Sequence, residues 1–265
     1  NARRRKRRRE EPDRDLFMIS DLDYAQRSVV AKVARQGNMV IYGPPGTGKS
    51  QTIVNLISDA ICKGKRVLVG RVGGVPAMTM QYIMNGYGLY DGVNGTVIDT
   101  SVAFNMMGSV FDSDDTVDYT TLFEPTATEY ERAGRGYVVA SVGAESGEVP
   151  YTAFVAKQSY LTEERGTAKL FLEAVRQGYE FIKDNDSLTV GEALEPSFDG
   201  MTAESLAIAV ESYLAIDAWC STPVMTEESL ERLKEIMRNA GELDGDPSFE
   251  NVVDNSLAEE IVGEG

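Results

Sequence analysis

The sequence predicts an α/β protein in which a strand, loop and helix unit is joined to a longer α/β lobe that ends in helices. Three patterns predict this class. The apolar run 38–42 precedes the glycine-rich segment 43–50, and apolar residues at helical spacing follow it up to 62. Short apolar runs alternate with short helical segments from 66 to 142. Amphipathic patterns then predict packing helices closer to the C-terminus.

The segment 43–50, GPPGTGKS, satisfies every fixed position of the phosphate-binding pattern G-x-x-x-x-G-K-[ST]. In this pattern, backbone N–H groups at a helix N-terminus bind the phosphates, the lysine reaches the β- and γ-phosphates, and the last hydroxyl binds Mg²⁺. We therefore expect a nucleoside triphosphate with Mg²⁺, and Ser50 as the metal ligand; a glycine-rich turn that binds nothing is the alternative. The predicted nucleotide-binding residues are Gly43, Gly46, Thr47, Gly48, Lys49, Ser50 and Gln51.

The stretches ISDLDYAQRSVV and NMVIYGPPGTGKSQTIVNLISDAICKGKRVLV resemble the first nucleotide-binding segment of superfamily 1 helicase-like ATPases, over residues 19–69. This resemblance implies that the nucleotide is ATP and that Gln26 reads the adenine. Turnover would also require an acidic Mg²⁺ residue on a later strand and an arginine finger. The sequence offers only Asp99, at the end of the apolar run 97–99, which is more simply a chance match in an acidic chain. We expect ATP binding without hydrolysis or unwinding, and no catalytic residue.

Charge divides the chain into unequal parts. Residues 1–67 carry 15 Lys and Arg against 7 Asp and Glu, whereas the remainder carries 11 against 35. We therefore divide the chain into a basic disordered tail at 1–15, a P-loop segment at 16–67 and an α/β lobe at 68–265. The run RRRKRRR at 3–9 predicts either nucleic-acid phosphate contacts or a solvated tail without a partner. The first residue is Asn, which suggests a fragment, and no apolar segment has the length of a membrane span.

The second part alternates strands and helices. The predicted strands are 66–70, 95–99, 118–123 and 136–142, and the predicted helices are 76–85, 104–110, 125–133, 169–183 and 227–240. Thr226 is expected to cap the last helix and Gly241 to end it. The turn before Pro76 has two glycines, so its backbone N–H groups face either a small anion or nothing in particular.

Other residue types exclude several chemistries. Histidine is absent, which excludes imidazole catalysis and His-ligated metal sites. Cys62 and Cys220 are far apart and are expected to be small core residues. The acidic cluster at 112–115 lacks the spacing of a calcium loop and is expected to be a solvated turn. Five methionines are expected to fill the core, namely Met78, Met80, Met84, Met106 and Met107.

A second resemblance covers residues 64–265. It is carried by GKRVLVGRVGGVPAMTMQYIMNGYGL, IDTSVAFNMMGSVF, DYTTLFEPTATEYERAGRGYVVASVG, SGEVPYTAFVAKQSYL and AIDAWCSTPVMTEESLERLKEIMRNAGEL, which resemble the solute-binding proteins of ABC importers of the nitrate, sulfonate and taurine type. The resemblance implies two α/β lobes that close on a small ligand, and an ABC permease as partner. The implied ligand-binding residues are Gly73, Gly74, Val75, Pro76, Thr100, Ser101, Asn105 and Glu124.

In this family a first lobe and an export signal should precede residue 64, where the helicase-like segment stands instead. We therefore expect a composite chain: a truncated ABC-transporter substrate-binding domain for a small anion or related solute, which carries an ATP- and Mg²⁺-binding P-loop. The alternatives are a fragment of a DNA/RNA helicase-like ATPase and a non-functional chimera joined near Lys65. The larger part implies a periplasmic or cell-surface location and the P-loop part a cytoplasmic one; no signal peptide is visible.

Overall fold

The computed structural model describes residues 22, 26–28, 30, 55, 59, 66–86, 88, 90 and 97–263. The predicted nucleotide-binding residues from Gly43 to Gln51 lie outside this part of the chain, as do the basic tail, Cys62 and the expected junction near Lys65. Between 22 and 59, only isolated positions are described.

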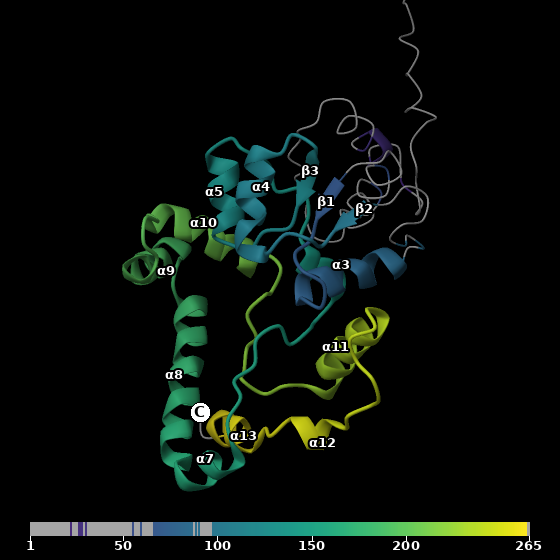
Figure 1. The fold of residues 1–265 in the computed structure, drawn as a ribbon. Helices are drawn as coiled ribbons and strands as arrows, with labels where there is room; N and C mark the ends of the chain where they lie inside the picture. The colour runs from purple at the N-terminus through teal and green to yellow at the C-terminus, as the bar shows by residue number, and fades with distance from the viewer. Residues whose placement is uncertain are drawn as a thin grey trace, which may run out of the picture.

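A small parallel sheet lies in the upper part of the molecule and confirms the predicted α/β class (Figure 1). Its strands are β1 (Arg66–Leu68), β2 (Val97–Asp99) and β3 (Val117–Thr120), in the order β2-β1-β3. Val67 of the central strand lies opposite Ile98 and Tyr119, and the pairing with β3 is irregular between Arg66 and Val67. All three strands were predicted, but β1 and β3 end two and three residues earlier than expected, and β3 begins one residue earlier.

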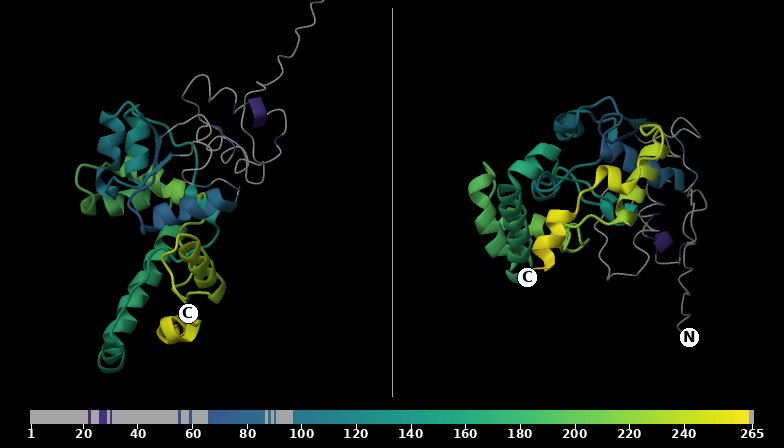
Figure 2. Two further views of the ribbon diagram at one scale, coloured as in Figure 1. Left: turned by 45° about the vertical axis from the view of Figure 1, so that its right-hand side comes forward. Right: turned by 90° about the horizontal axis from the view of Figure 1, so that it is seen from below.

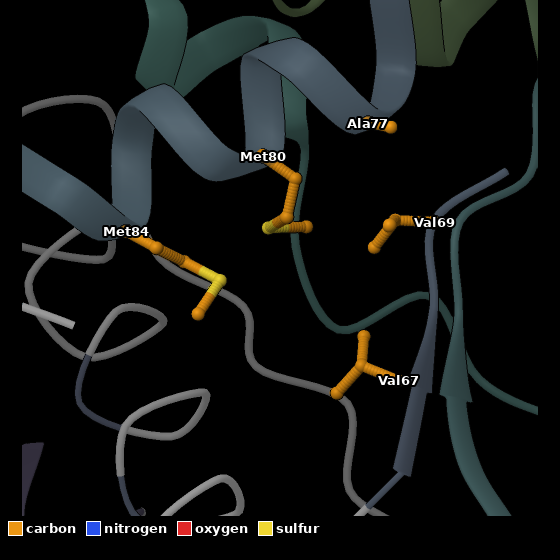
Figure 3. Packing of buried hydrophobic residues seen from close by; sticks show 5 residues of the cluster. All are labelled: Val67, Val69, Ala77, Met80 and Met84. Atoms are coloured by element: carbon orange, nitrogen blue, oxygen red, sulfur yellow. The ribbon is translucent and has the colours of Figure 1, made fainter. Parts of the chain in front are cut away.

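Helices cover both faces of the sheet. Successive residues of β1 point to opposite faces: Val67 and Val69 pack against α3 (Val75–Gly86), whereas Leu68 packs against α4 (Met107–Ser113). Figure 3 shows the first cluster, in which the two valines face residues spaced along α3, namely Ala77, Met80 and Met84. Burial of these side chains on both faces fixes β1 in the centre of the sheet.

Four of the five methionines expected in the core are buried, and Met106 is not. Met78, Met80, Met84 and Met107 are at most 5% exposed, whereas Met106 is 49% exposed. Met106 belongs to the short helix η1 (Phe104–Met106), and its neighbour Met107 takes the buried position at the start of α4.

The predicted strand at 136–142 is wrong. Residues 136–141 are irregular, Tyr137 and Val138 are more than two-fifths exposed, and α6 (Val142–Ser146) begins where the strand was expected to end. The hydroxyl of Ser141 accepts a hydrogen bond from the backbone N–H of Ala144 and so caps α6. A β-branched run forms a strand only where a neighbouring strand supplies backbone partners, and none of the described strands does so here.

The remaining helices lie outside the helices α3 and α4 that pack on the sheet (Figures 1 and 2). Residues 125–133 form α5 (Thr126–Arg132), as predicted. The others are α7 (Gln158–Glu163), α8 (Arg165–Asp184), α9 (Ser187–Leu194), η2 (Glu195–Ser197), α10 (Ala203–Leu214), α11 (Glu227–Asn239), α12 (Phe249–Val252) and α13 (Ser256–Gly263). The long helix α8 runs from α9 down to α7 and α13, and α11 lies beside α3.

Local signals set the ends of these helices. The hydroxyl of Thr226 accepts a hydrogen bond from the backbone N–H of Ser229, and Gly241 adopts a positive φ of 73° just beyond α11, so both predicted end signals are confirmed. Cys220, expected in the core, is exposed instead. None of the helices in the described ranges is both long enough and apolar enough to cross a membrane.

Candidate ligand site at the carboxyl edge of the sheet

The residues predicted to bind a solute follow the carboxyl ends of the three strands. Gly73, Gly74, Val75 and Pro76 follow β1; Thr100, Ser101 and Asn105 follow β2; Glu124 follows β3. Because the strands are parallel, these segments emerge at one edge of the sheet. In the order β2-β1-β3, the chain passes to opposite sides of β1, and ligands of open α/β sheets bind at such a switch point, between β1 and β3.

A tight turn links β1 to α3 on one side of this switch point. Gly70 and Gly73 have φ values of 84° and 71°, which residues with a Cβ rarely adopt. The N–H of Gly74 donates to the carbonyl of Arg71 (3.1 Å), and its own carbonyl accepts the first helical hydrogen bond, from Met78 (3.0 Å). The first turn of α3 thus begins at the carboxyl edge, where its free N–H groups favour negative charge.

A carboxylate of the same chain already lies at this turn. The carboxyl group of Glu242 is 3.2–3.3 Å from the point where a Cβ on Gly73 would stand. Glu242 follows α11, which is held against α3 by hydrogen bonds from Tyr82 to Glu235 (3.3 Å) and from Asn85 to Asn239 (2.7 Å). The turn therefore has both the Glu242 carboxylate and the exposed side chain of Arg71 beside it.

Ser101 forms hydrogen bonds within the loop that follows β2. Oδ1 of Asp99 accepts hydrogen bonds from the backbone N–H (2.8 Å) and the hydroxyl (2.6 Å) of Ser101, and Oδ2 accepts from Nε of Arg66 (2.8 Å). The Ser101 hydroxyl, followed by its backbone N–H and by Arg66, lowers the pKa of Asp99. Asp99 is therefore held by Ser101 and Arg66 at the end of β2.

Two carboxylates of the acidic cluster at 112–115 also have partners. Asp114 accepts a hydrogen bond from Arg66 (2.7 Å), and Asp112 accepts from Tyr130 (3.0 Å) and Arg135 (3.0 Å). No group of acidic or cysteine side chains suited to a metal ion occurs among the described residues. These hydrogen bonds connect Asp114 to β1 and connect α4 to α5.

Glu124 forms hydrogen bonds to two helices at the carboxyl edge of the sheet. Its Oε2 accepts a hydrogen bond from the backbone N–H of Thr128 (3.0 Å) in the first turn of α5, and its own N–H donates to the hydroxyl of Tyr213 (3.2 Å) in α10. Burial raises the pKa of Tyr213, which favours the neutral phenol at this contact. Three residues earlier, Thr121 has a buried hydroxyl that finds no hydrogen-bond partner among the described residues.

A cavity of about 240 Å³ lies on the α4 side of this edge. Its apolar walls come from Phe104, Leu122, Phe123 and the ring of Tyr130; its polar groups come from Asn105, Ser109 and Thr126, and Gly108 completes it. The rings of Phe104 and Phe123 are 4.5 Å apart, and Tyr151 packs on Phe123 at 5.3 Å. A Cβ on Gly108 would lie 2.6 Å from the Tyr130 hydroxyl oxygen, so a glycine is needed for Tyr130 to pack there.

Of the eight predicted solute-binding residues, Asn105 lines this cavity. The other seven lining residues were not predicted, because they come from three separate segments and include aromatic side chains that resemble ordinary core residues. Phe104 and Phe123 each follow the end of a strand within a few residues. That position was the feature of the sequence that could have indicated them as site residues. For the predicted nucleotide site, only Gln26 is described; it is half-buried in a helical stretch.

Comparison with known proteins supports both resemblances in coarse form. The chain is 33% identical over 202 residues to "Putative binding protein YtlA" of Bacillus subtilis (strain 168); the match covers 76% of this chain and 60% of YtlA. It is 46% identical over 55 residues to "Uncharacterized ATP-dependent helicase MG140" of Mycoplasma genitalium, and 46% identical over 52 residues to the homologue of that protein from Mycoplasma pneumoniae.

The helicase matches are short: they cover 21% and 20% of this chain and 5% of each helicase. No family model matches the chain, and no solved structure matches it. Most of the chain is therefore similar to a binding protein, of which it spans about three-fifths, and about a fifth of the chain is similar to helicases.

Proposed function

We propose that the α/β part of this chain is a substrate-binding domain of the ABC-importer type, which binds a small solute at the carboxyl edge of its sheet. The observation that carries this proposal is the strand order β2-β1-β3, with the glycine turn after β1 and the segment 121–124 after β3 on either side of the switch point. The Thr121 hydroxyl in this segment supports it, because it is buried and has no hydrogen-bond partner among the described residues, and such groups are rare away from ligand sites.

Similarity to YtlA supports the same proposal. The match has 202 residues, the length of the segment 64–265 that resembles solute-binding proteins. Solute-binding proteins of the resembled group close two lobes over the ligand, and the lobe described here would supply one wall. Since closure buries most of a ligand's surface, we expect weak affinity from this lobe alone. A permease partner belongs to the same proposal.

A second candidate function rests on the motif GPPGTGKS. We propose that Lys49 and Ser50 hold the phosphates and Mg²⁺ of ATP and that Gln26 contacts the adenine, without turnover. The 55-residue helicase match has nearly the length of the predicted segment 19–69. A nucleic-acid partner for the basic run 3–9 would show as binding that weakens steeply with added salt.

Calorimetric titration separates the two proposals. The full chain, Lys49→Ala and the control Lys32→Ala are titrated with ATP and Mg²⁺ and then with a panel of small anions and pyrimidines. A nucleotide site at the motif predicts that Lys49→Ala alone abolishes ATP binding, and an independent solute site predicts that all three proteins bind the same solute equally. Absence of solute binding from every panel member contradicts the first proposal, and ATP binding that survives Lys49→Ala contradicts the second.

A further inference from the structure

The cavity beside the carboxyl edge has room for a small molecule. Its volume of about 240 Å³ is that of about eight water molecules at ~30 Å³ each, and it is smaller than the usual pockets for drug-sized ligands. Phe104 and Phe123 supply neighbouring aromatic rings, and Phe123 remains 37% exposed. An aromatic ring gains most from contact with another ring in an offset or edge-to-face arrangement.

None of the described residues that line this cavity carries a charge. The nearby guanidinium of Arg135 is already engaged: it donates to Asp112 (3.0 Å) and lies 5.4 Å from the centre of the Tyr130 ring. At the other side of the switch point, the carboxylate of Glu242 lies against Gly73. An anion bound in the cavity would thus meet no cationic side chain among the described lining residues to replace the water that it displaces.

Polar groups in the cavity remain available for hydrogen bonds. The Asn105 amide and the hydroxyls of Ser109 and Thr126 form no hydrogen bond with any other described residue, and all three residues are exposed. A side-chain amide offers both N–H donors and a carbonyl acceptor, so it suits a ligand edge that also carries a donor and an acceptor.

We propose that the ligand of this site is a small uncharged ring compound with an amide-like edge, which stacks on Phe123 and hydrogen-bonds to Asn105, and not a small anion. This inference rests on the proposed solute-binding function and narrows the class of solute.

A matched pair of probes tests the charge requirement. Benzamide and benzoate have nearly the same size and shape but differ by one charge, and both are titrated into the full chain by calorimetry, with ligand-observed NMR for weak binding. We expect benzamide to bind at least ten-fold more tightly than benzoate. Taurine and nitrate serve as anionic references.

Two variants test the residues. Phe123→Leu keeps an apolar side chain but removes the ring, so benzamide binding should weaken about two- to ten-fold. Phe198→Leu is the control, because Phe198 has the same exposure of 37% and lies outside the cavity. Asn105→Asp keeps the shape but loses the N–H donors, and a loss of about three- to ten-fold is expected. Thermal melting of each variant verifies that it folds.

The outcomes separate this inference from the proposed function. Equal or tighter binding of benzoate, or equal loss in the Phe123 and Phe198 variants, overturns the inference while leaving solute binding intact. Binding of taurine or nitrate without benzamide does the same. Binding of neither member of the probe pair also overturns the inference, and the wider panel of solutes then decides whether the proposed function stands.

Discussion

The contact between α9 and α10 makes a sharp prediction about stability. Gly191 lies inside α9, and a Cβ placed on it would stand 2.3 Å from the backbone carbonyl oxygen of Ala203 and 3.1 Å from the N–H nitrogen of Ala207. Ordinary contacts begin near 3.4 Å, so Gly191→Ala must push the two helices about 1 Å apart. The carbonyl belongs to the backbone at the start of α10 and cannot rotate away as a side chain would.

The magnitude follows from two opposing effects. Overpacking of a tight contact costs about 1–3 kcal/mol, and a backbone clash of this depth belongs near the upper end. Alanine has the better helix propensity, which stabilises the folded state by about 1 kcal/mol. The free energy of unfolding should therefore fall by roughly 2 kcal/mol. For a chain of this size, that corresponds to a drop in Tm of about 4–8 °C.

Gly178→Ala is the matched control. Gly178 lies inside α8 and is exposed, and apart from its chain neighbours and the backbone of its own helix, no described heavy atom lies within 4 Å of the point where a Cβ would stand. The same substitution there should raise stability by about 1 kcal/mol, because only the propensity changes. Both variants are compared with the wild-type chain by thermal melting followed by circular dichroism. A Gly191→Ala protein that melts at or above the wild-type temperature would refute the packing argument.

Three further predictions concern charge and helix capping. The pKa of Asp99 is lowered from its ordinary value of 3.8, first by the Ser101 hydroxyl. The ionised carboxylate therefore stabilises the folded state above pH 3.8, and this stability is lost as the pH falls through the folded pKa. Acid melts of Asp99→Asn should therefore show a weaker loss of stability below pH 3.8 than wild type. Burial, together with Cys220, raises the pKa of Tyr179 to about 12. The neutral phenol therefore stabilises the folded state below pH 10, and this stability is lost as the pH rises from 10 towards 12. Ultraviolet titration should show one tyrosine that ionises near pH 12 and is missing from Tyr179→Phe. Thr226→Ala removes the cap of α11 and should lower the free energy of unfolding by about 1 kcal/mol in denaturant titration, whereas an unchanged midpoint would contradict the capping role.

Much of the fold follows from local patterns in the sequence. The strands, α3, α8 and α11 were predicted because their apolar spacing and end signals lie within each segment, as Thr226 and Gly241 show for α11. The strand expected at 136–142 failed because strand formation depends on a neighbour, which local sequence does not reveal. The prediction that Cys220 lies in the core was wrong for a similar reason, because a small apolar residue in a loop does not indicate whether another segment covers it.

The candidate site combines residues that local patterns indicate with residues that they do not. The predicted solute-binding residues follow the ends of the strands, and one of them, Asn105, lines the cavity at that edge of the sheet. Long-range packing decided the rest: Phe123 and Tyr130 approach from beyond β3, and Glu242 reaches the turn at Gly73 from a segment far along the chain. The Glu242 carboxylate places a negative charge beside Gly73, and no pattern in the sequence near Gly73 indicates this contact.

Hydrogen exchange with and without a bound solute tests the central claim most directly. The full chain is saturated with the tightest solute from the calorimetric panel, and amide exchange is followed by mass spectrometry. Binding at the switch point predicts slower exchange in segments 70–76 and 121–130, with no change in α8 and α13. Slower exchange confined to α8 and α13, or to segments far from the carboxyl edge of the sheet, would contradict the claim.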